Sequence, residues 1–284
     1  MTNPAMAPRN ASRLDGALRK AGLDKMACAA VVLWALIINS NSLGQDLLRH
    51  VDLASPEMTT AEMTRADVKM LIEKGSPVDL SDRRLSGLDL SELNLRGANL
   101  RLSRLNKTNL KGADLSGAIL DQAWALGSDF SEAKLVGASL FATQVQRAKL
   151  MNADLSNARL TADLTGANLT GATLVGIQGG ADMKNQSMGL IRTVLNSANL
   201  EHANLRRADL SRAKLEFATL TGSDLRDAVF TGASLAGADL TNAQVSGVDL
   251  TGADVAGAKL RNLSGLEQAN GLDKLVNADR AWRD

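Results

Sequence analysis

The stretch "NARLTADLTGANLTGATL" (residues 157–174) repeats one short phrase, with a leucine at the centre of each repeat. A leucine, or in a few repeats Phe or Val, recurs every fifth residue over most of the chain from Leu80 to Leu260. A small residue, most often Ala, precedes it by two positions, and Asp or Asn often stands between them. Ser, Thr or Arg and then Gly or Asn complete the phrase. Self-similarity at a fixed short period indicates a repeat architecture.

The five-residue period excludes an ordinary helix and a flat strand. Five residues of α-helix rotate by about 500°, so the leucines would spread around the helix axis. In a flat strand, an odd period sends successive leucines to opposite faces. Only a chain that bends once per repeat keeps Leu and Ala inside, Asp and Asn outside, and the turn-forming residues at the corner. The sequence therefore predicts a solenoid whose coils share one core.

The stretches "GADLSGAIL" (112–120), "SANLEHANLRRADLSRAKL" (197–215) and "GASLAGADL" (232–240) carry the motif A(D/N)LXX. In this motif the chain resembles the pentapeptide-repeat family over roughly two-thirds of its length. The resemblance implies an all-β solenoid, a right-handed quadrilateral parallel β-helix with four repeats per coil. We expect this β-helix to span residues 78–263.

Two irregularities interrupt the period. Leu164 follows Leu160 one residue early, and sixteen residues separate Leu174 from Leu190. With four repeats per coil, this spacing predicts that Leu160 and Leu190 lie on the same side. It also predicts an eleven-residue insertion within 175–189, a stretch rich in Gly and polar residues that is typical of a loop. The loop is either a tolerated insertion or a binding element.

The two ends of the solenoid need caps because they would otherwise expose unpaired strand edges. Residues 58–77 predict a helical N-terminal cap, with Thr59 and Glu62 as its capping box and Gly75 as its end. Residues 264–284 predict a C-terminal cap or tail. The expected apolar contacts of this tail are Leu266, Leu272, Leu275, Val276 and Trp282. Family members that dimerise do so through their C-terminal ends, but the polar tail does not favour a homodimer here.

Residues 1–57 form an N-terminal extension that does not follow the repeat. It contains "MACAAVVLWALII" (26–38), predicted to be a short apolar helix. Thirteen residues of helix span about 20 Å, less than the roughly 30 Å hydrocarbon core of a bilayer. The segment is consistent with a packed or partner-facing helix, a signal or membrane anchor, or a stretch upstream of a start at Met58. Its length favours the cytoplasm, with an exported or inner-membrane-anchored protein as the alternative.

The composition gives little indication of nucleic-acid binding, catalysis or metal binding. Lys and Arg number 32 against 31 Asp and Glu, which argues against direct nucleic-acid binding. His50 and His202 are far apart, and Cys28 lies inside the apolar run, so no nucleophile–base pair or metal-ligand set is apparent. The Asp and Asn residues before each leucine predict a structural row that binds turn backbone. We therefore expect no enzyme, cofactor or metal.

The candidate partner-binding residues form a basic group and an apolar group. The basic group lies between Glu92 and Asp114, where the chain has no acid. It is predicted to form a belt around one coil. Its members are Arg96, Arg101, Arg104, Lys107 and Lys111. The outward-facing apolar group consists of Trp124, Phe141, Leu102 and Leu126. Because Ala125 stands where a leucine is expected, Trp124 either turns inward or stays outside as a contact residue.

The leading functional hypothesis is a non-catalytic, rod-shaped scaffold that binds an unidentified protein partner. The resemblance supplies an alternative, because some family members bind type II topoisomerases such as gyrase as mimics of duplex DNA and protect them from quinolones or toxins. Duplex DNA presents about one negative charge per 1.7 Å, whereas 78–263 carries 20 Lys and Arg against 19 Asp and Glu. A third hypothesis is an exported or membrane-tethered solenoid, in which 26–38 contacts a membrane.

Overall fold

The computed structural model describes residues 51–181 and 191–282. The chain divides into two compact units, Met1–Leu47 and Leu48–Asp284, and the features below belong to the second unit. The apolar run 26–38 lies outside the described residues, as do Cys28 and His50. Within the described part of the chain, no helix is both long enough and apolar enough to span a bilayer.

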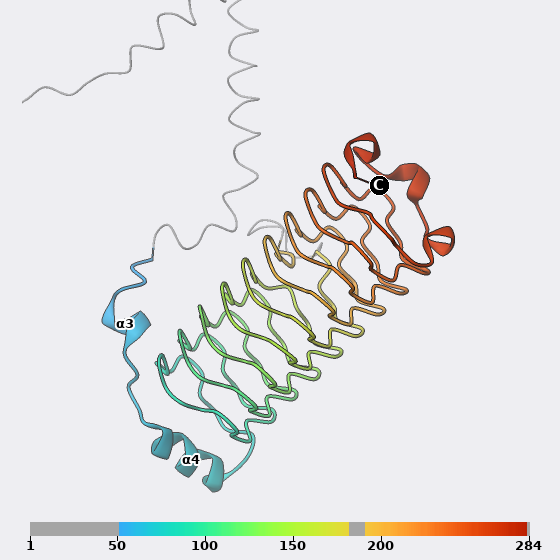
Figure 1. The fold of residues 1–284 in the computed structure, drawn as a ribbon. Helices are drawn as coiled ribbons and strands as arrows, with labels where there is room; N and C mark the ends of the chain where they lie inside the picture. Colours follow the sequence, from blue (N-terminus) through green and yellow to red (C-terminus); the bar gives the residue numbers. More distant parts are fainter. Residues whose placement is uncertain (1–50, 182–190, 283–284) are drawn as a thin grey trace, which may run out of the picture. The chain divides into compact units, whose positions relative to one another are not determined.

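The second unit winds into stacked coils joined by parallel bridges (Figure 1). In the regular coils each bridged residue pairs with the one twenty positions later, as Asp79 does with Asn99 and Arg84 with Arg104. A register of twenty residues equals four repeats of five, so each coil has four sides. The bridges are isolated, because each side is too short to form an extended strand. The fold is a four-sided parallel β-helix.

We number the sides by their first inward leucine. Leu80 lies on side 1, Leu85 on side 2, Leu90 on side 3 and Leu95 on side 4; Leu100 returns to side 1 because it belongs to the next coil. Sides 2 and 4 are opposite each other, as are sides 1 and 3. Corners take the numbers of the two sides that they join.

Backbone hydrogen bonds explain the shape of each repeat. The Leu80 N–H donates to the carbonyl of Asn99 at 2.7 Å, and the Asn99 N–H donates back to Val78 at 2.9 Å. At the corner, the Ala98 N–H donates to the Leu95 carbonyl at 3.0 Å. The third corner residue, here Gly97, has a φ of 64°. Gly and Asn adopt positive φ most readily, which accounts for their place in the repeat.

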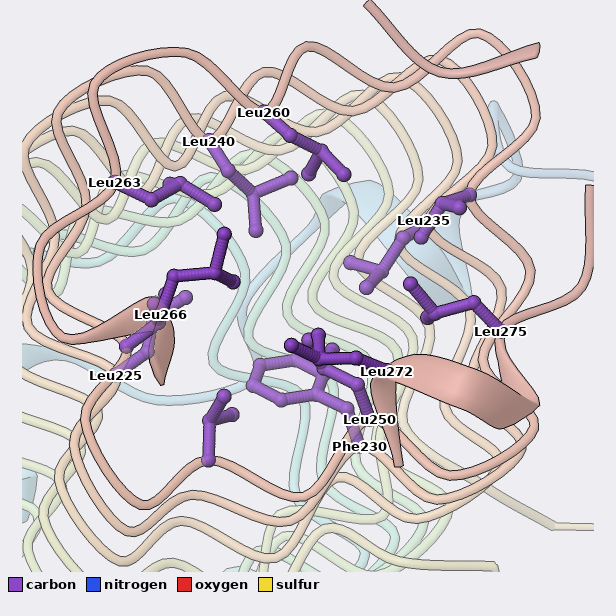
Figure 2. A pocket seen from close by; sticks show the side chains of 13 residues that line it. Leu225, Phe230, Leu235, Leu240, Leu250, Leu260, Leu263, Leu266, Leu272 and Leu275 are labelled. Carbon is purple, nitrogen blue, oxygen red and sulfur yellow. The ribbon is translucent and has the colours of Figure 1, made fainter. Parts of the chain in front are cut away.

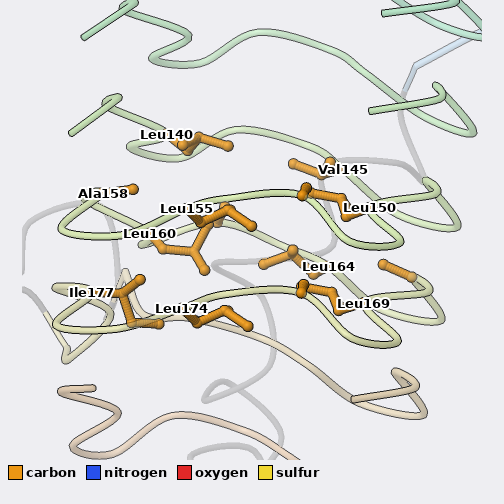
Figure 3. Packing of buried hydrophobic residues seen from close by; sticks show 14 of the residues in the cluster. Leu140, Val145, Leu150, Leu155, Ala158, Leu160, Leu164, Leu169, Leu174 and Ile177 are labelled. Carbon is orange, nitrogen blue, oxygen red and sulfur yellow. The ribbon is translucent and has the colours of Figure 1, made fainter. Parts of the chain in front are cut away.

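The inward residues of all four sides form one continuous core, shown for neighbouring coils in Figure 3. Leu115, Leu155 and Leu210 are fully buried, and Leu240 is only 2% exposed. The aspartates that directly precede these leucines are partly or fully exposed: Asp114, Asp154, Asp209 and Asp239. The predicted inward and outward positions are therefore confirmed.

The early leucine shortens one coil. Gln144 pairs with Asp163, a register of nineteen, and Leu164 is still fully buried. The coil that follows is longer, because Asp163 pairs with Val194, thirty-one positions later. Relative to a regular coil, this register contains eleven additional residues, the number expected from the sequence.

The insertion begins later than the sequence predicted. The Gly179 N–H donates to the Asp209 carbonyl at 2.8 Å, so 175–179 belongs to a regular coil and not to a loop at 175–189. Gly179 lies on the side of Leu160. A Cβ at Gly179 would lie 2.6 Å from Thr193 Oγ1, so glycine replaces leucine at this crowded place. Leucine spacing could not reveal a repeat whose centre is glycine, and Leu190 itself lies outside the described residues.

Two helices precede the coils, α3 (Pro56–Thr59) and α4 (Arg65–Lys74). Thr64 caps α4: its N–H donates to Asp67 Oδ2 at 2.8 Å, and the Asp67 N–H donates to Thr64 Oγ1 at 3.3 Å. The predicted capping box of Thr59 and Glu62 is wrong. Thr59 ends α3, and the Glu62 carboxylate instead forms ion pairs with two arginines of the first coil. Gly75 ends α4 as predicted.

At the other end, three short 3₁₀ helices follow the last regular repeat: η3 (Leu266–Gln268), η4 (Leu272–Lys274) and η5 (Ala278–Arg280). The ladder continues through them, since Asp249 pairs with Asn270, Asp254 with Val276 and Lys259 with Trp282. The register grows from 21 to 22 to 23 because each of these repeats has one extra residue.

The end of the core is apolar. In Figure 2, Leu266, Leu272 and Leu275 surround a cavity of about 20 Å³ together with leucines of the last coils. Two predicted contacts of the tail are wrong, because Val276 is 46% exposed and Trp282 61% exposed. Both occupy the bridged position, which points away from the leucine core.

Candidate functional site

In many repeats the outward bridged position holds Asp or Asn, and this side chain has a structural task. The Asp114 carboxylate accepts the Ser116 N–H at 3.0 Å, and Asp239 accepts the Thr241 N–H at 3.0 Å. The side-chain and backbone hydrogen bonds from Thr251 hold the pKa of Asp249 below its ordinary value of 3.8. The predicted role of this row, bonding the backbone of the following corner, is confirmed.

Side 2 differs from the other three sides in the first coils. Its first four bridged residues are Arg84, Arg104, Trp124 and Gln144, none of which is Asp or Asn. In the first two coils, the other three sides carry the pairs Asp79 and Asn99, Asp89 and Asn109, and Asn94 and Asp114. On side 2 the position therefore holds long side chains in place of the support that Asp and Asn give to the corner.

Ion pairs fix the two arginines of side 2. Arg84 Nε lies 3.3 Å from Glu62 Oε2, and Arg104 Nη1 forms a close ion pair with Asp82. Trp124 bridges Arg104 and Gln144 in the ladder and is half-buried, whereas Ala125 is fully buried. Trp124 thus stays outside, because the bridged position points away from the core whatever its neighbour is.

The predicted apolar group gathers around side 2. Leu102 lies at corner 1–2 and is 45% exposed, and Leu126 lies at corner 2–3. Phe141 also lies at corner 1–2, where the Arg159 guanidinium stands 4.1 Å from the centre of its ring. We call this area the Trp124 surface. It consists of Arg84, Arg104, Trp124, Leu102, Leu126 and Phe141.

The basic belt does not form one patch, because its residues surround the coil. Arg96 lies at corner 4–1 and Lys111 at corner 3–4, both away from the Trp124 surface. Acids of neighbouring coils pair with most of its members. The pairs are Arg96 with Asp114 at 3.2 Å, Arg101 with Asp121 at 3.4 Å, Lys111 with Glu132 at 3.1 Å, and Arg104 with Asp82. Arg101, Arg104 and Lys107 are the members near side 2.

Sequence reasoning missed Phe217, at corner 2–3 several coils further along. Phe217 is 69% exposed and has a φ of 59°, a conformation that bulky residues rarely adopt. Its ring covers the next corner, since a Cβ at Gly237 would lie 2.6 Å from Phe217 Cδ1. The available signal was a Phe in the corner position where Gly or Asn is usual.

The described residues contain no group of three or more His, Cys, Asp and Glu that could hold a metal ion. His202 lies at an exposed corner, with Nε2 3.8 Å from the Glu201 carboxylate. What the arrangement offers is a rigid surface of arginine and apolar side chains, which suits binding.

The class of protein follows from this geometry: a β-solenoid built from five-residue repeats around a leucine core. The profile described as pentapeptide repeats (8 copies) matches residues 84–122, 127–162, 143–178, 190–227 and 228–262. Together these ranges span more than half of the chain. The chain belongs to the pentapeptide-repeat family, whose fold is the right-handed quadrilateral β-helix.

Several solved structures of the same kind are similar to the chain. HetL, from the cyanobacterium Nostoc sp. strain PCC 7120 and involved in heterocyst differentiation regulation, is 29% identical, with 78% of this chain and 95% of that chain covered and a TM-score of 0.32. QnrB1, a plasmid-mediated fluoroquinolone resistance protein, is 18% identical, with coverages of 72% and 91% and a TM-score of 0.36. The comparison with curated proteins found no match.

Proposed function

We propose that this protein is a non-catalytic scaffold that binds another protein through the Trp124 surface. The carrying observation is the row Arg84, Arg104 and Trp124 on side 2, where the other sides begin with Asp or Asn. Trp and Arg supply much of the binding energy in protein interfaces. Arg and Trp at this position replace the Asp or Asn whose side chain bonds the corner backbone, so they do not contribute that hydrogen bond to the stability of the fold.

The rigidity of this surface supports the same proposal. Arg84 and Arg104 are already oriented by Glu62 and Asp82. The backbone of Trp124 is bonded to the preceding coil, because its N–H donates to the Ser103 carbonyl at 2.9 Å and its carbonyl accepts the Leu105 N–H at 2.6 Å. A partner would therefore meet side chains that lose little conformational freedom on binding.

Co-purification with matched variants tests the proposal. Trp124→Ala removes the central aromatic side chain, and Lys134→Ala changes the outward residue of side 4 in the same coil. Loss of a central Trp costs about 2 kcal/mol or more, so Trp124→Ala should weaken recovery of the partner about thirty-fold. Lys134→Ala should leave it unchanged. Equal recovery with Trp124→Ala and wild type would remove this surface from the proposal.

We also propose that α4 caps the N-terminal end of the solenoid. Val68 of α4 is fully buried within the core cluster, and Met63, Leu71 and Ile72 pack against that cluster. Arg65 donates to the carbonyls of Asp89 and Ser91 at 2.6 and 2.7 Å. A helix in this position covers apolar surface that the first coil would otherwise expose.

We propose that the solenoid lies in the cytoplasm. The support for this proposal is the length of the 26–38 run, which is short for a membrane-spanning helix. Fractionation with an antibody to the repeats, combined with the N-terminal sequence of the mature protein, tests it. A periplasmic protein that begins near residue 41 or 43 would favour the exported alternative.

A further inference from the structure

A cavity of about 290 Å³ lies between the N-terminal segment 51–60 and corner 2–3 of the first three coils. Apolar side chains and one cation among the described lining residues point to a small-molecule site. Leu53, Met58 and Thr59 line it from the segment, and Gly87, Asn106, Lys107 and Leu126 line it from the corner.

Asn106 holds this cavity open. Its Nδ2 donates to the Met58 carbonyl at 3.0 Å, and its Oδ1 accepts the Leu126 N–H at 3.0 Å. Both ends of the amide are thus used to fix the segment above the corner. Gly87 leaves space below, because a Cβ there would meet no atom within 4 Å. The cavity is a preformed feature of the fold.

Charge determines what the cavity can accept. Lys107 is the only ionisable residue among the described residues that line the cavity. Within 51–181 and 191–282, Lys107 forms no ion pair, in contrast to the other four cations of the basic belt. An apolar cavity with one unneutralised ammonium group favours a molecule with an apolar body and one negative charge.

The volume of the cavity limits the size of the ligand. A cavity of about 150 Å³ lined by Leu, Ile and Phe holds a benzene molecule, so this cavity, about twice as large, has room for a chain of eight carbon atoms that includes a carboxylate. We propose that it binds small amphipathic carboxylates. The apolar chain contacts Leu53, Met58 and Leu126, and the carboxylate pairs with the Lys107 ammonium group. This proposal does not depend on the protein-binding role of the Trp124 surface.

Titration of the full chain with sodium octanoate tests the proposal. The methyl signals of ¹³C-labelled methionine report on the cavity, and a Met58→Leu variant identifies the signal of Met58. Octanoate should shift this signal along a saturable curve. Octan-1-ol, which has the same chain without the charge, should bind about five-fold more weakly, the upper range for an exposed ion pair. Absence of a saturable shift with octanoate would overturn the proposal.

A matched pair of variants separates the ion pair from general apolar binding. Lys107→Gln introduces a residue that fits the positive φ of this corner position, since Gln122 occupies the same position of another repeat with a φ of 60°. It should weaken octanoate binding about five-fold and leave octan-1-ol binding unchanged. Arg101→Gln removes another cation of the same coil, away from the cavity, and should change neither. Equal octanoate affinity in Lys107→Gln and wild type would refute the assigned role of Lys107.

Discussion

At the scale of single residues, the leucine rows carry the fold. Leu210 is fully buried, and on side 1 it lies between Gly179 and Phe230 of the adjoining coils. Leu210→Ala should reduce the free energy of unfolding by about 2–5 kcal/mol, because the stacked coils cannot collapse to fill the space left behind. Urea denaturation measures this loss. Met151→Ala, at an exposed corner, is the control and should cost less than about 0.5 kcal/mol. A comparable loss in both variants would contradict the assigned core.

Outward aspartates make stability depend on pH. The pKa values of three outward aspartates are lowered by hydrogen bonds from the residues two positions later, which are Ser81, Ser91 and Thr251 in chain order. The three aspartates are Asp79, Asp89 and Asp249. A carboxyl with a folded-state pKa below its unfolded value stabilises the protein above the unfolded value. This stability is lost as the pH falls through the folded pKa.

The urea midpoint should therefore be constant above about pH 5 and fall below 3.8, the ordinary pKa of Asp. Asp249→Asn keeps the acceptor but cannot titrate, so it should reduce the steepness of the fall. An equally steep acid transition in this variant would show that Asp249 does not contribute.

At the scale of elements, the helix α4 shows how far local signals reach. Its end at Gly75 was predictable, because glycine is the usual residue after a helix. Its start was not, because "TTAEMTRAD" (59–67) contains two Thr residues followed three positions later by an acid. Glu62 is taken by Arg83 and Arg84, which only the folded first coil brings near.

Thr64→Ala should cost about 1 kcal/mol in the free energy of unfolding, since it removes the acceptor that caps α4. Thr60→Ala, an exposed change outside the helix, should cost much less. Thermal denaturation of both variants measures the difference. If Thr60→Ala were the more harmful change, the cap would be wrongly assigned.

At the scale of the whole molecule, the period predicted the architecture, but not the site. Each leucine position follows from the repeat, so a solenoid with a leucine core was predictable from the residues alone, whereas four repeats per coil followed from the resemblance to the family. The neighbours across coils depend on register. Trp124 lies on side 2 and Leu102 at the adjoining corner 1–2 of the preceding coil, because the two are twenty-two residues apart, close to one coil. Arg96 and Lys111 are fifteen apart and fall on other corners. The predicted start of the loop at residue 175 was wrong because the repeat centred on Gly179 has no leucine that would mark it in the sequence.

The charge distribution predicts that the protein does not act on gyrase. Purified gyrase should supercoil DNA at the same rate with and without low micromolar protein, because sides that mix Lys and Arg with Asp and Glu do not reproduce the uniform charge of a duplex. A quinolone should inhibit the reaction equally in both cases. Inhibition of supercoiling or protection from the drug would overturn this prediction.

Site-specific photo-crosslinking in the native cell tests the central claim most directly. A photoreactive phenylalanine analogue replaces Trp124 on side 2 in one strain and Lys134 on side 4 of the same coil in another. The two positions share backbone geometry and differ only in the side that they face. The account predicts a discrete crosslinked protein from position 124 and none from position 134. The same product from both positions, or a product from 134 alone, would contradict the claim that side 2 is the binding surface.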